Sequence, residues 1–183
     1  MKLATQYDRI YNSGAELAAV SVDDDTRQAG MSERCGFTHT RFVSDPGGEN
    51  YLQPLDLFDP AERGGIALPG MVIVTPDGEE VYRYQGRDFA DRTNDDDIWK
   101  TLDELNLPPV DPEPWVPAVD VPADLTGYFR PRDFAAYFGG NHFGALAIGL
   151  RLEDPASKAI AKEHRLMSKS NLEAWAEWGQ HAK

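Results

Sequence analysis

The sequence predicts an α/β fold, in which helices flank a central mixed sheet, followed by a helical C-terminal extension. Within residues 1–106, short apolar runs typical of strands alternate with apolar residues at helical spacing. A proline-rich stretch then precedes residues 131–183, where two long helical patterns follow each other. With 183 residues, 41% of them hydrophobic, the chain is long enough for one ordinary domain and an extension.

The first half of the α/β part predicts the order helix, strand, helix, strand. Apolar residues recur at helical spacing in residues 3–11, and the run 17–22 (LAAVSV) is typical of a strand buried on both faces. The acidic residues 23–25 precede a helix over residues 27–34, and a carboxylate there is suited to cap the helix. Residues 41–44 predict the second strand.

The second half begins at a turn and ends in a helix. Residues 45–48 (DPGG) have strong turn chemistry, and a short helix is expected over residues 50–55. Residues 71–84 predict a hairpin, in which MVIVT and EVYRY are strands joined around a PDG turn. A helix capped by Asn94 is expected over residues 95–105.

The rest of the chain predicts a linker and two helices. Residues 107–130 are rich in proline and predict a stiff, extended linker, with Trp115 docking it onto the domain. Helices are expected over residues 131–150, interrupted at Gly139 and Gly140, and from Pro155 to about residue 180. Each carries an apolar stripe, so we expect a helical hairpin that packs on the core or on a second copy of the chain, as a homodimer.

Charge and cysteine content narrow the functional classes. The net charge of −13 repels phosphates, which disfavours partners such as nucleic acid or an anionic membrane surface, and the acidity is better explained as a general property of the surface than as a site for one partner. A single cysteine excludes an intramolecular disulfide and fits a reducing compartment. No signal or membrane-spanning segment is evident, so a cytoplasmic location is expected if residue 1 is the true start. No motif calls for a metal or another cofactor.

Three segments, in order, resemble a known family. They are residues 16–25 (ELAAVSVDDD), 42–48 (FVSDPGG) and 67–88 (ALPGMVIVTPDGEEVYRYQGRD). Together they resemble the alkyl hydroperoxide reductase/thiol-specific antioxidant branch of the peroxiredoxin-like (redoxin) proteins. The resemblance implies a thioredoxin-like fold for about the first 105 residues, without the family's first strand and cysteine motif. By that comparison residues 1–14 correspond to the body of the helix that follows the motif.

The resemblance also implies a site. Pro69 would be the family's cis-proline beside the active-site thiol, with the backbone of Leu68 presented to an extended substrate. Read locally, Pro69 is instead a trans proline that opens an edge strand. The implied activity is reduction of a small peroxide or disulfide by a cysteine thiolate, which a thiol reductant then regenerates.

Two explanations remain open for the absent cysteine motif. If residue 1 is a misassigned start, the protein is a peroxiredoxin-like thiol oxidoreductase whose catalytic segment lies outside this chain. If the truncation is genuine, the protein is a non-catalytic thioredoxin-fold binding or scaffolding protein. Whether the chain is an enzyme is therefore undecided. A genuine truncation would also remove a central strand of the sheet, and the two strands beside it would be left with unpaired backbone groups.

Cys35 is the one candidate thiol. Only Arg34 is near enough in the sequence to lower the pKa of this thiol, so a packing role is favoured over that of a nucleophile.

Overall fold

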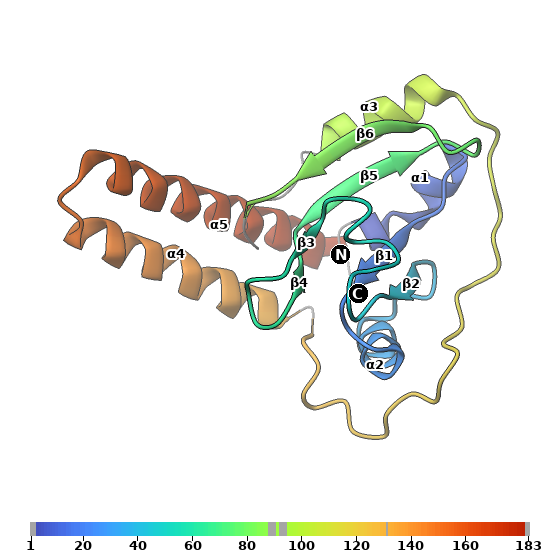
Figure 1. Ribbon diagram of the computed structural model, residues 1–183, viewed down its shortest axis with the longest axis horizontal. Coiled ribbons are helices and arrows are strands. Elements are labelled where there is room, and N and C mark those ends of the chain that lie inside the picture. The colour runs from blue at the N-terminus through green and yellow to red at the C-terminus, as the bar shows by residue number, and fades with distance from the viewer. Residues whose placement is uncertain (1–2, 88–90, 92–94, 131, 182–183) are drawn as a thin grey trace. The chain divides into compact units, whose positions relative to one another are not determined.

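The chain divides into two compact units, Met1–Tyr128 (unit 1) and Phe129–Lys183 (unit 2). Unit 1 is a mixed α/β structure and unit 2 is helical (Figure 1). The computed structural model describes side chains as far as residue 176 and the backbone of residues 3–87, 91, 95–130 and 132–181.

Unit 1 begins with the predicted order of helix, strand, helix and strand. A 3₁₀ turn at Leu3–Thr5 leads into α1 (Tyr7–Asn12), which is followed by β1 (Ala18–Ser21), α2 (Asp25–Cys35) and β2 (Arg41–Ser44). The two strands pair in parallel, with Ala18 opposite Arg41 and Ser21 opposite Ser44. The connection through α2 is the helical crossover that a parallel pair of strands requires.

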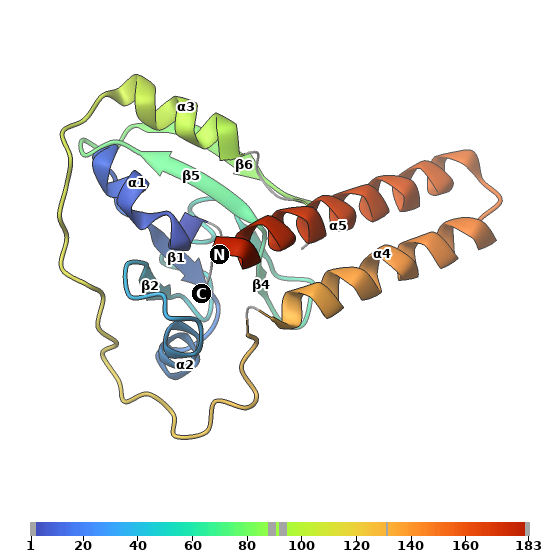
Figure 2. The same ribbon diagram turned by 180° about the vertical axis from the view of Figure 1, so that it is seen from behind.

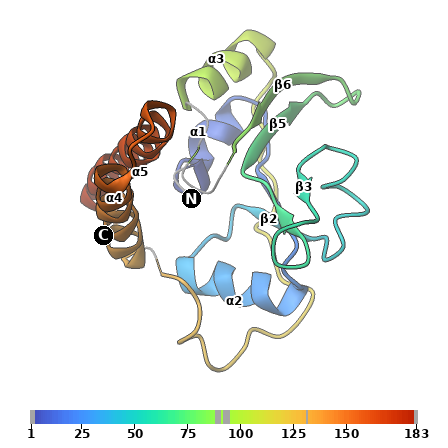
Figure 3. The same ribbon diagram turned by 60° about the vertical axis from the view of Figure 1, so that its left-hand side comes forward.

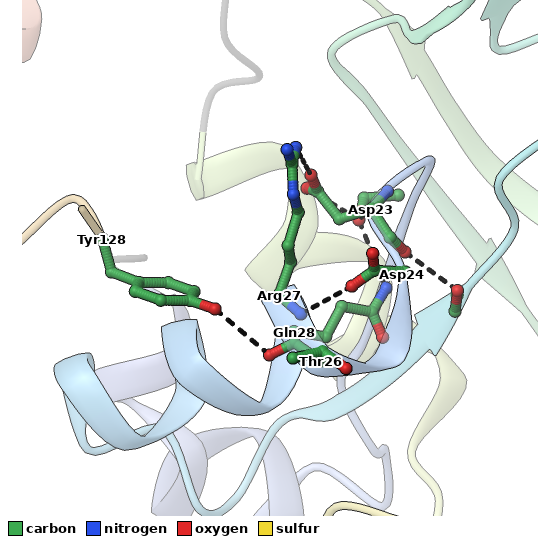
Figure 4. A network of polar contacts seen from close by, with 8 residues as sticks. Asp23, Asp24, Thr26, Arg27, Gln28 and Tyr128 are labelled. Atoms are coloured by element: carbon green, nitrogen blue, oxygen red, sulfur yellow. Dashed lines mark hydrogen bonds and ion pairs between the residues drawn. The ribbon is translucent and has the colours of Figure 1, made fainter. Parts of the chain in front are cut away.

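A network of polar contacts holds the N-terminus of α2 (Figure 4). The Asp24 carboxylate accepts a hydrogen bond from the backbone N–H of Arg27 at 2.8 Å, which confirms the predicted acidic cap. Tyr128 donates from its hydroxyl to the carbonyl of Thr26 at 3.4 Å, and its ring lies against Gly30. A Cβ at Gly30 would lie 2.3 Å from that ring, so the glycine is what allows the end of the linker to contact α2.

After β2 the chain turns at residues 45–48 as predicted, with the N–H of Gly48 donating to the carbonyl of Asp45 at 2.9 Å. The short helix expected over residues 50–55 is wrong, because residues 49–56 form successive turns. The Asp45 carboxylate binds the N–H groups that open this segment, and Asp56 adopts a left-handed φ of 54°, which ends the helical path after a single turn.

The remaining strands form two antiparallel pairs. The short strands β3 (Phe58–Asp59) and β4 (Ile66–Ala67) pair with each other. The predicted hairpin is confirmed as β5 (Gly70–Val74) paired with β6 (Glu80–Gln85). The helix α3 (Asp95–Leu105) matches its predicted bounds, and its expected cap, Asn94, lies outside the described residues.

The strands do not join into the single central sheet that the sequence predicted. Among the described residues they form three separate two-stranded sheets: β1–β2, β3–β4 and β5–β6. The expectation that β1 is buried on both faces is also wrong, because Ala18 is exposed and the other residues of the strand are only half-buried. A continuous apolar run encodes a strand that suits full burial, but only the surrounding elements decide whether that burial is reached.

The core of unit 1 lies where α1 and α3 meet. Ile10 from α1 packs with three buried residues of α3, namely Ile98, Trp99 and Leu102. The half-buried side chains of Leu17, beside β1, and of Met71 and Ile73 in β5 border the same cluster. Figure 3 shows α1 and α3 on the same side of the β5–β6 hairpin. The core therefore borders β5 and the residue that directly precedes β1, although these two strands belong to different sheets.

The linker runs without helix or strand from Asn106 to Arg130 and is fastened to unit 1. Trp115 docks as predicted. The centroid of its ring lies 5.2 Å from that of the Phe42 ring, and its backbone N–H donates to the carbonyl of Thr38 at 2.8 Å. Val110 adds a backbone hydrogen bond to Tyr11 at 3.0 Å. This part of the chain is stiff because of its prolines and is also held by contacts.

Unit 2 is a helical hairpin of α4 (Asp133–Arg151) and α5 (Pro155–His181), which lie side by side in Figure 2. The predicted interruption at Gly139 and Gly140 is wrong, because α4 passes through both residues unbroken. Packing of α4 along α5 outweighs the low helix propensity of glycine. Among the described residues, no helix has the length and apolar character that crossing a membrane requires.

Candidate functional site

The segment predicted to support an active site, Leu68 and Pro69, connects β4 to β5. The expected cis bond at Pro69 is wrong, because the peptide bond is trans. The N–H of Leu68 donates to the carbonyl of Leu57 at 2.8 Å, and the carbonyl of Pro69 accepts from the N–H of Gly86 at 2.6 Å. Pro69 thus directly precedes β5 at the end of the hairpin, where the N–H that proline lacks removes only the last hydrogen bond, to Gly86.

The only cysteine of the sequence, Cys35, is the last residue of α2. Its Sγ is 3.9 Å from the Sδ of Met31 and the residue is half-buried. Burial raises the pKa of the Cys35 thiol, and the neighbouring Arg34 lowers it by less. Since the thiolate is the nucleophilic form, these surroundings favour a packing role.

We expect Cys35 to react slowly with an alkylating reagent. Because its pKa is raised and its Sγ is half-buried, iodoacetamide at neutral pH should modify it at least about tenfold more slowly than in the urea-unfolded chain. Mass spectrometry of timed samples measures both rates. A folded-state rate equal to or above the unfolded rate would contradict the packing role.

The carbonyl and N–H groups of β1 alternate between its two edges, and only one edge is paired. The carbonyls of Leu17 and Ser21 accept from the N–H groups of Arg41 and Asp45, both at 2.9 Å. Because successive residues of a strand point their backbone groups in opposite directions, those of Ala18 and Val20 point away from β2.

The strand β5 is also paired along only one of its two edges. Pro69 pairs with Gly86 by a hydrogen bond, so by alternation Met71 and Ile73 exchange hydrogen bonds with their β6 partners, Tyr84 and Tyr82. The backbone groups of the intervening residues, Gly70 and Val72, point away from β6. Within the described part of the chain, no backbone hydrogen bond reaches these groups or those of Ala18 and Val20. We call these four residues the outward edges of β1 and β5.

A shallow depression elsewhere in unit 1 gathers polar and aromatic side chains that the sequence analysis did not connect. The Tyr11 hydroxyl donates to the carbonyl of His39 at 3.2 Å, and the Tyr7 ring stacks on the His39 ring with centroids 3.8 Å apart. Burial, and then the charge of Glu16, raise the pKa of Tyr11. The depression is lined by Tyr11, Glu16, Leu17, His39, Arg41, Pro112, Glu113 and Trp115.

This cluster fastens the linker and satisfies its own polar groups. Arg41 pairs with Glu16 at 3.1 Å, and the backbone of Tyr11 binds Val110. The contributing residues come from α1, the segment before β1, the start of β2 with the residues before it, and the linker. They are far apart in the sequence, so no local motif could have revealed them. We therefore regard the depression as a structural contact of the linker.

The two acidic runs, residues 23–25 and 95–97, stabilise the N-termini of helices. Asp23 pairs with Arg27 at 3.5 Å and Asp24 caps α2, while the three residues 95–97 form the first turn of α3. Carboxylates there are favourable because a helix N-terminus carries partial positive charge. Throughout the described residues, no group of three or more His, Cys, Asp or Glu side chains is arranged to hold a metal ion.

Comparison of the chain with protein-family models, with curated proteins and with solved structures gave no match. The resemblance of residues 16–25, 42–48 and 67–88 to the peroxiredoxin-like proteins therefore stays a prediction. The structure establishes a mixed α/β unit with small sheets, and a helical hairpin.

Proposed function

We propose that unit 1 is a thioredoxin-like unit that acts by binding: it accepts an extended segment of another polypeptide between β1 and β5. The observation that carries the proposal is the pair of outward edges, at Ala18 and Val20 and at Gly70 and Val72. Unpaired strand edges are the usual acceptors in recognition by strand addition, since they offer N–H and carbonyl groups at regular spacing.

The shared core supports placing the ligand between these two strands. Leu17, Met71 and Ile73 border the same apolar cluster of α1 and α3, yet they remain half-buried. A strand laid along either edge would place alternate side chains over this cluster. We therefore expect the bound segment to be extended, with apolar residues at every second position.

The backbone chemistry supports the same placement. Within the described residues, the outward backbone groups of β1 and β5 have no backbone partner. A bound strand would remove the cost of leaving them without one. The apolar run that includes β1 suits a strand in the interior of a sheet better than one at an edge.

A second candidate is a peroxiredoxin-like thiol oxidoreductase, which rests on the three resembling segments. Its chemistry needs a thiolate, and the surroundings of Cys35 disfavour that form. We expect this chain to show no peroxide consumption above the buffer rate when dithiothreitol is the reductant. Consumption that Cys35→Ser abolishes would replace the binding function with the enzymatic one.

Amide exchange measured by NMR tests the binding function. In the chain alone, the Val20 and Val72 amides should exchange faster than those of Ala19 and Met71, which face the paired edges. Slow exchange at Val20 and Val72 would mean that both edges are already covered, and would overturn the proposal.

The second stage adds a ligand. The probe is a panel of capped eight-residue peptides in which valine alternates with threonine or lysine. At least one peptide should protect the Val20 and Val72 amides together. Proline has no amide hydrogen, so in Val20→Pro the readout is the Val72 amide. Val20→Pro should abolish the protection of Val72 while β1 still pairs with β2, because the Val20 N–H points away from β2. Val20→Thr is the matched control and should still show protection of Val72. Failure of every peptide, or protection of Val72 that survives Val20→Pro, would contradict binding between the two edges.

A further inference from the structure

The helix α4 has an apolar surface that α5 does not cover. Its interior, residues 134–150, holds 17 residues without a formal charge, between Asp133 and Arg151. Contact with α5 accounts for one side of the helix, where Phe138 and Ala145 are buried and Gly149 approaches Ala161. The opposite side is exposed, and it consists of Ala136, Gly140, Phe143, Gly144, Ala147 and Leu150.

This α4 outer face is exposed to a degree that is unusual for its residue types. Phe143 is 68% exposed and Leu150 is 77% exposed. A Cβ placed on Gly140 or Gly144 would meet no atom within 4 Å, so packing against α5 does not explain these glycines. Glycine weakens the interior of a helix, but it also lets another backbone approach closely.

The charges at the two ends of α4 indicate which partner fits. Asp133 and Arg151 are 18 positions apart, which is about five turns, so they lie on the same side of the helix. The midpoint between them is residue 142, and Gly140 and Gly144 flank that midpoint symmetrically. Two antiparallel copies related by a twofold axis at this point would place Asp133 beside Arg151 of the partner subunit, and Gly140 beside Gly144 of the partner subunit.

The distribution of charge also favours contact between copies through unit 2. Residues 1–128 carry 25 acidic and 10 basic residues, whereas residues 129–183 carry 6 acidic and 8 basic residues. Two copies of unit 1 repel each other strongly, while two copies of the helical hairpin are nearly neutral toward each other. An anionic membrane surface fits less well, because the α4 outer face has no basic residue between its ends.

We propose that the α4 outer face is a homodimer interface, in which α4 packs antiparallel against α4 of a second copy of the chain. The Asp133 carboxylate accepts hydrogen bonds from the backbone N–H and the guanidinium of Arg130 at 2.8 to 2.9 Å, and in the dimer Arg151 of the partner subunit lies beside this pair. The glycines allow the two helices to meet closely, and Phe143 and Leu150 become covered.

Sedimentation equilibrium of the full chain over a range of concentrations tests the interface. The unchanged chain should dimerise, and Gly144→Leu should weaken the dimer at least about 100-fold by blocking close approach. Ala135→Leu places the same leucine side chain at an exposed position off this face and should dimerise like the unchanged chain. Circular dichroism confirms that both variants are folded. A chain that stays monomeric at about 100 µM, or a dimer that Gly144→Leu does not weaken, would overturn the proposal.

A charge exchange tests the antiparallel arrangement. Arg151→Asp places like charges together at both ends of the interface and should weaken the dimer about tenfold. Combining it with Asp133→Arg restores opposite charges and should recover the affinity to within about threefold. A double variant that dimerises no better than Arg151→Asp contradicts the arrangement. Val20→Pro should leave dimerisation unchanged, so this interface and the strand-binding function fail or succeed separately.

Discussion

Replacing Asp45 by alanine is expected to lower the melting temperature by about 10 °C. The residue is only 1% exposed, and its carboxylate accepts hydrogen bonds from the backbone N–H groups of Asn50, Tyr51 and Leu52 at 2.9 to 3.1 Å. Alanine would leave these three donors without their acceptor. Thermal unfolding followed by circular dichroism measures the change.

Glu49→Ala is the matched control, because this exposed carboxylate lies in the same turn. Its melting temperature should stay within about 2 °C of the unchanged chain. If Asp45→Ala and Glu49→Ala behaved alike, the hydrogen bonds of Asp45 would not stabilise the turn.

The contribution of Asp45 should depend on pH in one direction. Burial alone would raise the pKa of its carboxyl, but the hydrogen bonds from Leu52, Asn50 and Tyr51 outweigh burial and lower the pKa. The folded state thus favours the carboxylate, so the stabilisation is complete above the unfolded-state pKa of about 4. It is lost as the pH falls through the lower folded-state pKa. Urea midpoints of the unchanged chain and Asp45→Ala should therefore converge below about pH 4, and a constant difference would contradict this.

Replacing Leu102 by alanine is expected to reduce the free energy of unfolding by about 3 kcal/mol. Leu102 is 5% exposed and packs with Ile10, Ile98 and Trp99, so truncation removes buried methyl groups and leaves a cavity in the core of unit 1. Urea unfolding followed by tryptophan fluorescence and circular dichroism measures the change. Asp103→Ala, at the next and exposed position of α3, should change the free energy by less than about 0.5 kcal/mol. Equal effects of the two variants would show that α3 does not pack through Leu102.

Elements whose signals are local were predicted well. The strand at residues 41–44 and the helix at residues 95–105 have the bounds expected from the sequence. The hairpin of β5 and β6 follows from its PDG turn, and α2 begins beside the acidic cap that was expected. In these cases the signal and its consequence lie within a few residues, so no distant contact decides the outcome.

The errors arose where a distant group decides the structure. The helix expected over residues 50–55 is replaced by turns that end at the left-handed Asp56, where the side chains of Arg83 and Gln85 from β6 donate to the carbonyls of Leu55 and Asp56. The cis bond expected at Pro69 came from the resemblance, whereas the observed trans bond suits the pairing of Pro69 with Gly86. The interruption at Gly139 and Gly140 is absent because α5 packs along α4.

The sequence by itself determined the order of most helices and strands, the stiff linker with its Trp115 anchor, and the acidity of the chain. The tertiary structure alone decided that the strands form three separate sheets and that β1 and β5 each keep one outward edge. It also left one side of α4 uncovered. Periodicity and turn chemistry act over a few residues, whereas strand pairing and burial depend on elements that are far apart in the chain and meet only when it folds.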